Sequence, residues 1–260
     1  MWVKTGQITS TIMDTYCHLC DDHYINLTVN TVLELPAHRE TLIHFFERIQ
    51  KAYPTMGNFY TRDGGEQVVL EDDRDNDSYR WLSVEVRRLS AGYVNPPSVD
   101  AAFQYHRMIL ENAPFHLSLS PLDCEAVDVL VGFDYTYQGN HNQLVADVLG
   151  VPPAFERLLE VPSARVVHYE PLLTLALDQD CNLQCRVNIE TRTQDYHVRK
   201  EEYPEEQISV YVTCRHYGLL PGDNRFLRTL DLLLKTGMTT VDDFVAPMIL
   251  EPLAKAIALR

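Results

Sequence analysis

The sequence predicts an α+β fold: one extended antiparallel sheet, or two smaller sheets, with helices on one face and a C-terminal helix. Two observations favour this class. Several segments alternate between apolar and polar residues with a period of two, which is typical of half-buried strands. The last three such segments are joined by connections of about four to eleven residues, which are too short for the crossover helix that parallel neighbours need.

Five strands and three helices are expected in the first 150 residues. The expected strands are 25–35, 58–61, 67–70, 79–94 and 127–137, and the expected helices follow Pro36, follow Ser98 and span 143–149. In the first strand Ile25, Leu27 and Val29 alternate with polar residues, which fixes the period. The alternation slips by one residue at Arg87-Arg88, and this slip predicts a β-bulge inside the strand 79–94.

The segment 150–163 contains three prolines and is the expected boundary between two parts, 1–150 and 151–260, which we expect to pack as one unit. Three strands are expected after it, at 165–178, 183–195 and 207–217. The remaining chain, 225–260, is expected to be helical, and Pro247 and Pro252 must kink or divide it. Thr240 and Asp243 have the spacing of a capping box.

The charge balance disfavours two classes of partner. The net charge is −15, the acidic excess is spread along the chain, and no Lys/Arg run is longer than two residues. Phosphate contacts dominate nucleic-acid affinity, and such a field repels phosphates. Anionic membranes are disfavoured for the same reason. We therefore expect a protein partner or self-association, with no nucleic acid and no membrane.

Cellular location is predicted from the apolar segments and the cysteines. No stretch reaches 18 apolar residues, and the N-terminal segment has no continuous apolar core of the kind that a secretory leader carries. Six cysteines in 260 residues are too few for a disulfide scaffold and are compatible with reduced thiols. We expect a cytoplasmic protein.

Two cysteine pairs could supply the four ligands of a zinc site. They are Cys17 with Cys20, and Cys181 with Cys185. Cys185, however, is in phase with the apolar residues of its expected strand, and free cysteine is among the most commonly buried residues. We expect core cysteines, no metal and no cofactor, with the four cysteines as weak candidates only.

No recognised catalytic motif is present. Asp73-x-Asp75-x-Asp77 resembles the start of a calcium loop, but the sixth position is Ser78 and the twelfth is Val84, where that loop needs Gly and Glu. No Gly-x-Ser-x-Gly, Walker A or Gly-x-Gly-x-x-Gly sequence occurs. The catalytic residues are unknown, and the absences favour a protein that is not an enzyme.

The clearest candidate site is the polar phase of the last three strands. Successive side chains of a strand point to opposite faces, so the polar phase of each strand belongs to one surface. Arginine and tyrosine are concentrated there, and both are enriched where proteins bind each other. The candidate binding residues are Arg186, Glu190, Arg192, Tyr211, Arg215 and Tyr217, with His168 and Glu170 from the segment 165–178.

Three functions are consistent with these patterns. The first is an interaction or accessory protein that acts through the polar sheet face, with the apolar C-terminal helix as a possible dimer contact. The second is a small-molecule-binding domain with an apolar cavity between the sheet and the C-terminal helix. The third is a hydrolase or transferase that uses carboxylates such as Glu170, Asp178 and Glu190.

Overall fold

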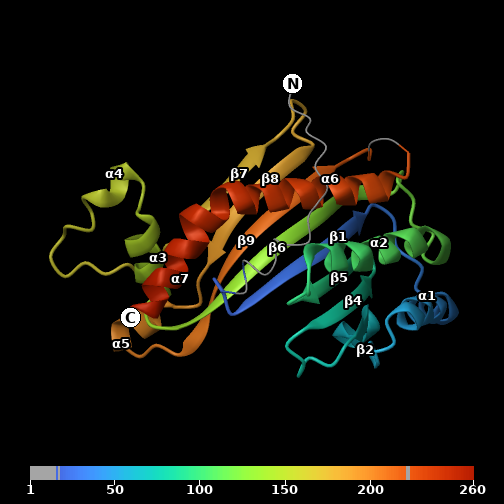
Figure 1. Ribbon diagram of the computed structural model, residues 1–260, viewed down its shortest axis with the longest axis horizontal. Coiled ribbons are helices and arrows are strands. Elements are labelled where there is room, and N and C mark those ends of the chain that lie inside the picture. The colour runs from blue at the N-terminus through green and yellow to red at the C-terminus, as the bar shows by residue number, and fades with distance from the viewer. Residues whose placement is uncertain (1–15, 17, 221–222) are drawn as a thin grey trace.

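The computed structural model describes residues 16, 18–220 and 223–260. Its strands form one nine-stranded sheet in the order β2-β3-β4-β5-β1-β6-β9-β8-β7, and all neighbouring strands are antiparallel (Figure 1). The predicted α+β class, the antiparallel sheet and the C-terminal helix are confirmed. The last three expected strands are antiparallel neighbours, as predicted.

The described elements have the following bounds. The strands are β1 (Asp22–Thr31), β2 (Asn58–Arg62), β3 (Gln67–Glu71), β4 (Tyr79–Glu85), β5 (Arg88–Val94), β6 (Cys124–Gln138), β7 (Leu172–Ala176), β8 (Leu183–Glu190) and β9 (Glu205–Tyr217). The helices are α1 (Arg39–Ala52), η2 (Asp63–Gly65), α2 (Val99–His116), α3 (His141–Leu149), α4 (Pro153–Glu156), α5 (Asp195–Lys200), α6 (Arg225–Thr240), the π-helical η3 (Val241–Leu250) and α7 (Glu251–Ala258).

The topology repeats once along the chain. Residues 22–116 form a first unit that runs strand, helix, strands, long helix, and its first strand β1 pairs with its last strand β5. Residues 124–240 form a second unit with the same plan, in which β6 pairs with β9. The two first strands, β1 and β6, pair with each other at the centre of the sheet. The expected division at residue 150 falls inside the second unit, between α3 and α4.

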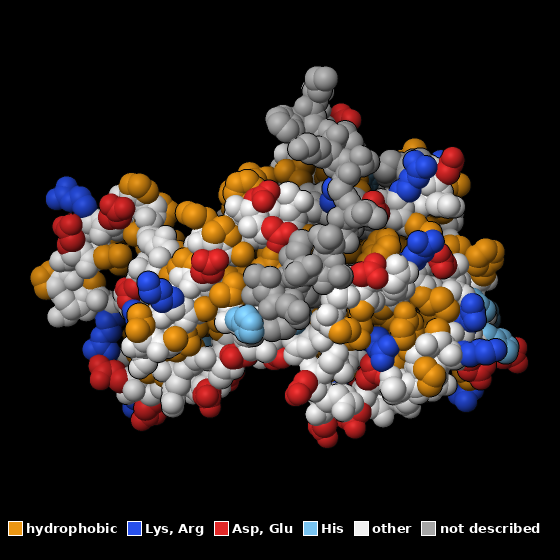
Figure 2. Space-filling view, viewed as in Figure 1, with side chains coloured by type: hydrophobic (Ala, Val, Ile, Leu, Met, Phe, Trp, Pro, Cys, Tyr) orange, Lys and Arg blue, Asp and Glu red, His pale blue; other side chains and the backbone are white. Residues whose placement is uncertain are grey.

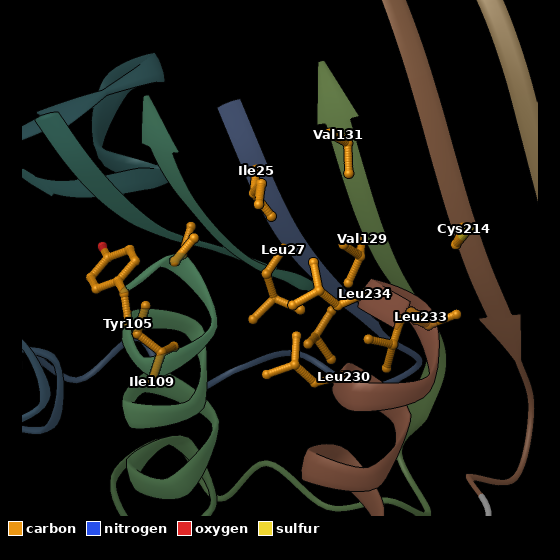
Figure 3. Packing of buried hydrophobic residues seen from close by; sticks show 14 of the residues in the cluster. Ile25, Leu27, Tyr105, Ile109, Val129, Val131, Cys214, Leu230, Leu233 and Leu234 are labelled. Carbon is orange, nitrogen blue, oxygen red and sulfur yellow. The ribbon is translucent and has the colours of Figure 1, made fainter. Parts of the chain in front are cut away.

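The hydrophobic core lies between one face of the sheet and the helices α1, α2 and α6. The long helix α6 packs on β6 and β9, and α2 packs on β5 and β1 and against α6 (Figure 1). Leu230, Leu233 and Leu234 of α6 meet Val129 and neighbouring sheet residues in a fully apolar interface (Figure 3). The helices therefore cover the face of the sheet that carries the apolar side chains of its strands. The alternate, mostly polar side chains point to the opposite face.

The predicted strand 79–94 is wrong in one respect. It is two strands, β4 and β5, which pair with Glu85 opposite Arg88 and turn back through Val86 and Arg87. The slip in alternation that predicted a bulge is this hairpin turn. The turn contains none of the Gly, Asn or Asp residues that usually mark such a connection, so its sequence resembles a continuous strand.

The predicted strands 165–178 and 183–195 are shorter than expected. Side chains of α3 hold the chain before β7, because Val166 N donates to Gln143 Oε1 and Tyr169 N donates to Asn142 Oδ1. Backbone N–H groups that bond to these side chains do not form hydrogen bonds with a neighbouring strand. β8 ends at Glu190, and α5, which we did not predict, begins five residues later, at Asp195. The first strand likewise covers 22–31 rather than 25–35.

The C-terminal helix divides as the prolines predicted. Pro247 lies in the π-helical η3, and Pro252 lies in the first turn of α7. The expected capping box at Thr240 is wrong, because the chain is helical on both sides of that residue. Thr240 Oγ1 donates instead to Thr236 O, one turn earlier in the same helix.

We expect the free energy of unfolding to fall by about 2 kcal/mol between pH 7 and pH 5 because of His106 alone. This side chain is fully buried on α2, where burial lowers the pKa of its imidazole from 6.5 to about 4. The unfolded chain therefore binds the proton first, and stability is lost as the pH falls through the window from about 6.5 to 4. Urea denaturation at the two pH values measures the loss.

The matched pair for this test is His106→Gln and His44→Gln. His106→Gln should remove the His106 share of the pH dependence, whereas His44 is exposed on α1 and its replacement should leave the dependence intact. Equal pH dependence in His106→Gln and in the parent protein would contradict the assignment.

Candidate functional site

The face of the sheet opposite the helices collects the polar phase of every central strand, and we call it the open face. Its side chains come from both units. They include Asp22, Tyr24, Asn26, Thr28 and Asn30 of β1, Trp81, Ser83 and Glu85 of β4, Asp128, Leu130 and Asp134 of β6, Gln184, Arg186, Asn188 and Glu190 of β8, and Ser209, Tyr211, Thr213, Arg215 and Tyr217 of β9.

The strand register brings most of the predicted binding residues together on this face. Arg186 lies opposite Thr213, and Glu190 lies opposite Ser209. Arg192 follows the end of β8 and donates to Ser209 Oγ at 3.3 Å. The polar phase predicted from β8 and β9 is therefore one surface, with its rows aligned across the strands.

Most charges on the open face are paired. Arg215 holds both carboxylate oxygens of Asp128 on the neighbouring strand and donates to Tyr217 Oη at 2.9 Å. The hydrogen bond with Asp128 is the main reason that the pKa of Arg215 is raised above its ordinary value. Arg192 lies 3.5 Å from Glu190. Arg186, in contrast, is exposed and makes no ion pair or side-chain hydrogen bond with any described residue.

Aromatic rings lie flat on the centre of the open face, over glycines. A Cβ at Gly132 would overlap the ring of Tyr24, and one at Gly92 would overlap the indole of Trp81. These two positions therefore need glycine for the rings to lie against the backbone. Tyr24 also contacts Tyr211, with ring centroids 6.4 Å apart. These rings give the centre of the open face an apolar surface between its polar side chains.

Four buried polar atoms on the open face have no hydrogen-bond partner among the described residues. They are Asn26 Oδ1, Ser83 Oγ, Asn188 Oδ1 and Thr213 Oγ1. Ser83 is only 1% exposed, and Asn188 and Thr213 are each 7% exposed. A buried polar group without a partner destabilises the free protein by about 1–3 kcal/mol. Such groups usually have a partner, so a cluster of them on one surface requires an explanation.

A second polar cluster lies where Asp22 is opposite Asp134. Burial raises the pKa of the Asp134 carboxyl, although hydrogen bonds from Ser209 and Tyr24 act in the other direction. Tyr24 donates to Asp134 Oδ1 at 3.2 Å, and burial and this carboxylate raise the pKa of the Tyr24 hydroxyl. Tyr24 is therefore a hydrogen-bond donor, held in position by Asp134.

The remaining predicted residues lie outside the open face. Glu170 precedes β7 and accepts from Thr191 N at 2.7 Å, while His168 is exposed with its Nε2 4.0 Å from Glu170 Oε2. Asp178 follows the other end of β7. The structure therefore does not bring Glu170 and Asp178 together.

Of the four candidate zinc cysteines, the structure describes three, and these three are not brought together. Cys17 lies outside the described residues, Cys20 Sγ donates to Tyr16 O, and Cys181 is exposed in the connection between β7 and β8. Cys185 is buried on the helix side of the sheet, where its direct neighbour is Cys214. A hydrogen bond from Cys214 lowers the pKa of the Cys185 thiol to about 7. In the described part of the chain, no three His, Cys, Asp or Glu side chains are grouped to hold a metal.

Sequence reasoning missed the half of the site that the first unit contributes. Asn26, Trp81 and Ser83 alternate with core residues as clearly as Arg186 and Thr213 do, so the signal was present. Only the strand order shows that β1 and β6 lie between β4 and β9. That order joins two polar surfaces that are far apart in the sequence into one.

An apolar groove lies on the helix side of the sheet, near the edge that β2 forms. It has a volume of about 420 Å³ and lies between α1 and the strands β2 to β4, lined by Leu42, Ile43, Phe59, Val68 and Val84 among others. The apolar cavity considered from the sequence was expected beside the C-terminal helix. Side chains of α6 pack directly against the sheet there (Figure 3).

A comparison of the chain with models of known protein families found no match, and a comparison with curated proteins found none either. No helix within the described ranges is long and apolar enough to cross a membrane. We therefore infer function from the geometry of the open face.

We expect Thr213→Val to raise the free energy of unfolding by about 1 kcal/mol, because it removes a buried hydroxyl that has no partner and keeps the shape of the side chain. Thr193→Val is the matched control. The Thr193 hydroxyl accepts from His141 N at 3.1 Å and donates to Gly139 O at 3.2 Å, so its loss should lower stability by about 1–3 kcal/mol. Urea denaturation measures both. A loss of stability in both variants would mean that the Thr213 hydroxyl is satisfied in the free protein.

Proposed function

We propose that this protein is a non-catalytic interaction protein whose open face binds a protein partner. The observation that carries the proposal is the set of buried, unpartnered polar atoms on that face, at Asn26, Ser83, Asn188 and Thr213. A bound partner that supplies the missing hydrogen bonds would remove their unfavourable contribution. The destabilised groups in the free protein would then be part of its specificity.

The chemistry of these atoms favours a polypeptide partner. Two of them, on Asn26 and Asn188, are amide oxygens, which accept and therefore need N–H or O–H donors from a partner. The backbone and side chains of a protein provide N–H donors beside hydroxyl acceptors. The unpaired guanidinium of Arg186 adds a group that binds a carboxylate of the partner in a two-pronged geometry. The overall charge of −15 disfavours a nucleic acid on the same surface.

The pairing of two open-face carboxylates, Asp128 and Glu190, favours binding over catalysis at these two groups. Asp128 is held at both oxygens by Arg215, and Glu190 lies beside Arg192. A general acid or base needs a carboxyl group that is free to exchange a proton with a substrate. The proposal also includes the cytoplasm as the location, since the described cysteines are free thiols, which a reducing compartment maintains.

We expect Arg186→Glu to weaken the partner complex at least tenfold, or about 1.4 kcal/mol, because a guanidinium that meets a carboxylate is replaced by a like charge. The partner is first isolated on the purified protein from an extract of the cells that make it, then purified itself and titrated by calorimetry. Arg228→Glu is the matched control: it makes the same charge change on an exposed residue of α6, in the helix layer.

Thr213→Val should weaken the same complex while it stabilises the free protein. A partner that binds Arg186→Glu and Thr213→Val as tightly as the parent protein would place the binding site elsewhere. Equal weakening by Arg228→Glu would mean that net charge, rather than the open face, controls the affinity.

A second candidate function rests on the groove between α1 and the strands β2 to β4. Its volume of about 420 Å³ and its apolar walls suit a small apolar molecule. Native mass spectrometry of the purified protein, repeated after denaturation, tests this candidate. An organic mass that is present only in the native spectrum, and that is lost in Ile43→Arg, would favour it. A bare polypeptide mass in both spectra would count against it.

A further inference from the structure

The strand β7 closes one edge of the sheet and is exposed on both of its faces. All five of its residues are exposed, and none is charged. Leu172 is 61% exposed on one face, and Leu173 and Leu175 are 60% and 51% exposed on the other. Edge strands in natural proteins usually carry charges, prolines or a covering element that prevents pairing with another strand. β7 has no charge and no proline.

The outer backbone edge of β7 carries N–H and C=O groups that pair with no residue in the described part of the chain. Leu177 N donates to Leu183 O, and Ile189 N donates to Pro171 O, so the odd-numbered residues of this segment face β8. Antiparallel bonding alternates along a strand. The N–H and C=O groups of Leu172, Thr174 and Ala176 therefore point away from the sheet, ready to pair with a further strand.

Two of the three exposed leucines of β7 lie on the helix side of the sheet. Leu173 and Leu175 lie opposite Val187 and Cys185, which carry the apolar phase of β8. Leu177, 45% exposed, continues this row. Hydrophobic side chains reach the surface beside α6 over β7 and β8 (Figure 2; compare Figure 1). An apolar row of this length on the surface marks an interaction site.

The opposite edge of the sheet is different in character. β2 has the sequence Asn-Phe-Tyr-Thr-Arg, and Arg62 at its end donates to Tyr60 Oη. A charged and polar edge of this kind does not match an uncharged leucine edge. A head-to-tail contact between β2 of one copy and β7 of the next would therefore join unlike surfaces, and an open chain of copies is disfavoured.

We propose that β7 pairs with β7 of a second copy of this chain, antiparallel, about a two-fold axis at Thr174. In this register the outward groups form three hydrogen-bonded pairs: Thr174 with Thr174, and Leu172 with Ala176 twice. Leu173 of each copy then lies beside Leu175 of the other on the helix side. The two sheets become one continuous sheet, and each leucine row buries part of its apolar surface against the row of the other copy.

Self-complementarity is the reason to choose a second copy as the occupant. Read in the antiparallel direction, Leu-Leu-Thr-Leu-Ala sets leucine against leucine or alanine on both faces, and threonine against threonine. No charged residue lies within the paired strand. In this register Glu170 of one copy lies in line with Asp178 of the other, just beyond each end of the ladder, and these like charges oppose pairing. Repulsion between the more distant charges of the two copies, each of net charge −15, is screened beyond about 8 Å at physiological salt.

Sedimentation equilibrium from 1 to 100 µM tests the proposal. We expect the parent protein to approach twice its chain mass of 29.9 kDa as the concentration rises. Thr174→Pro should remain at the chain mass. Proline removes an N–H that points away from β8, so the β7–β8 ladder and the far-ultraviolet circular dichroism should be unchanged.

Leu175→Lys is a second variant that needs no change in the backbone. It should also remain at the chain mass. In the proposed register the lysine ammonium would lie beside Leu173 of the other copy, in an apolar contact. Leu33→Lys is its matched control, since Leu33 is 66% exposed and lies after β1, away from β7. Leu33→Lys should associate like the parent protein.

Three results would overturn the proposal. The first is a parent protein at the chain mass throughout this concentration range. The second is a dimer that survives both Thr174→Pro and Leu175→Lys. The third is a series of masses beyond the dimer, which would mean an open contact instead of a closed two-fold pair. None of these results bears on the open face, which is tested through Arg186 and its partner.

Discussion

The pairing of β1 with β6 is the constraint on which the rest of the fold depends. These two strands are the first strands of the two units, and their register sets Leu27 opposite Val129 on the helix side and Asn26 opposite Leu130 on the other. Because the side-chain period of a strand is two, a slip of one residue would turn the apolar set of one unit toward water. The pair therefore fixes, for every strand added on either side, which face meets the helices and which becomes the open face.

The polar character of the open face follows from this alternation, but the burial of its polar atoms does not. Alternation alone would leave the Ser83 and Thr213 hydroxyls in water, where each would be hydrogen-bonded. Both side chains are nevertheless buried. The same face carries the large rings of Trp81 and Tyr24, which lie against the backbone only because Gly92 and Gly132 have no Cβ. Buried hydroxyls without a partner destabilise the free protein, which is more typical of a binding surface than of an inert solvated face.

The sequence predicts the parts of this structure that depend on local periodicity. The antiparallel order of β7, β8 and β9 and the shared face of Arg186 and Arg215 follow from short connections and alternation. Interactions distant in sequence decide the rest. The tight turn at Val86-Arg87 lacks the usual turn residues, and Asn142 on α3 holds the chain before β7 out of the ladder. The order of strands also depends on which apolar faces share a core, so the contribution of β1 and β4 to the open face could not be read from the sequence.

The exposed edge follows from a difference between the two units. A helix about 10 Å wide covers roughly two strands spaced at about 4.8 Å. In the first unit α2 packs on β5 and β1, and α1 extends the helix layer over the strands beyond them. In the second unit α6 packs on β6 and β9, but α3, which occupies the position of α1 in the chain order, is short and packs against α7. The strand β8 still reaches the helix layer, because Cys185 is only 4% exposed and its thiol lies 3.8 Å from Thr240 Oγ1 of α6. The strand β7 extends past that layer. Its leucines need a cover that the described part of the chain does not provide.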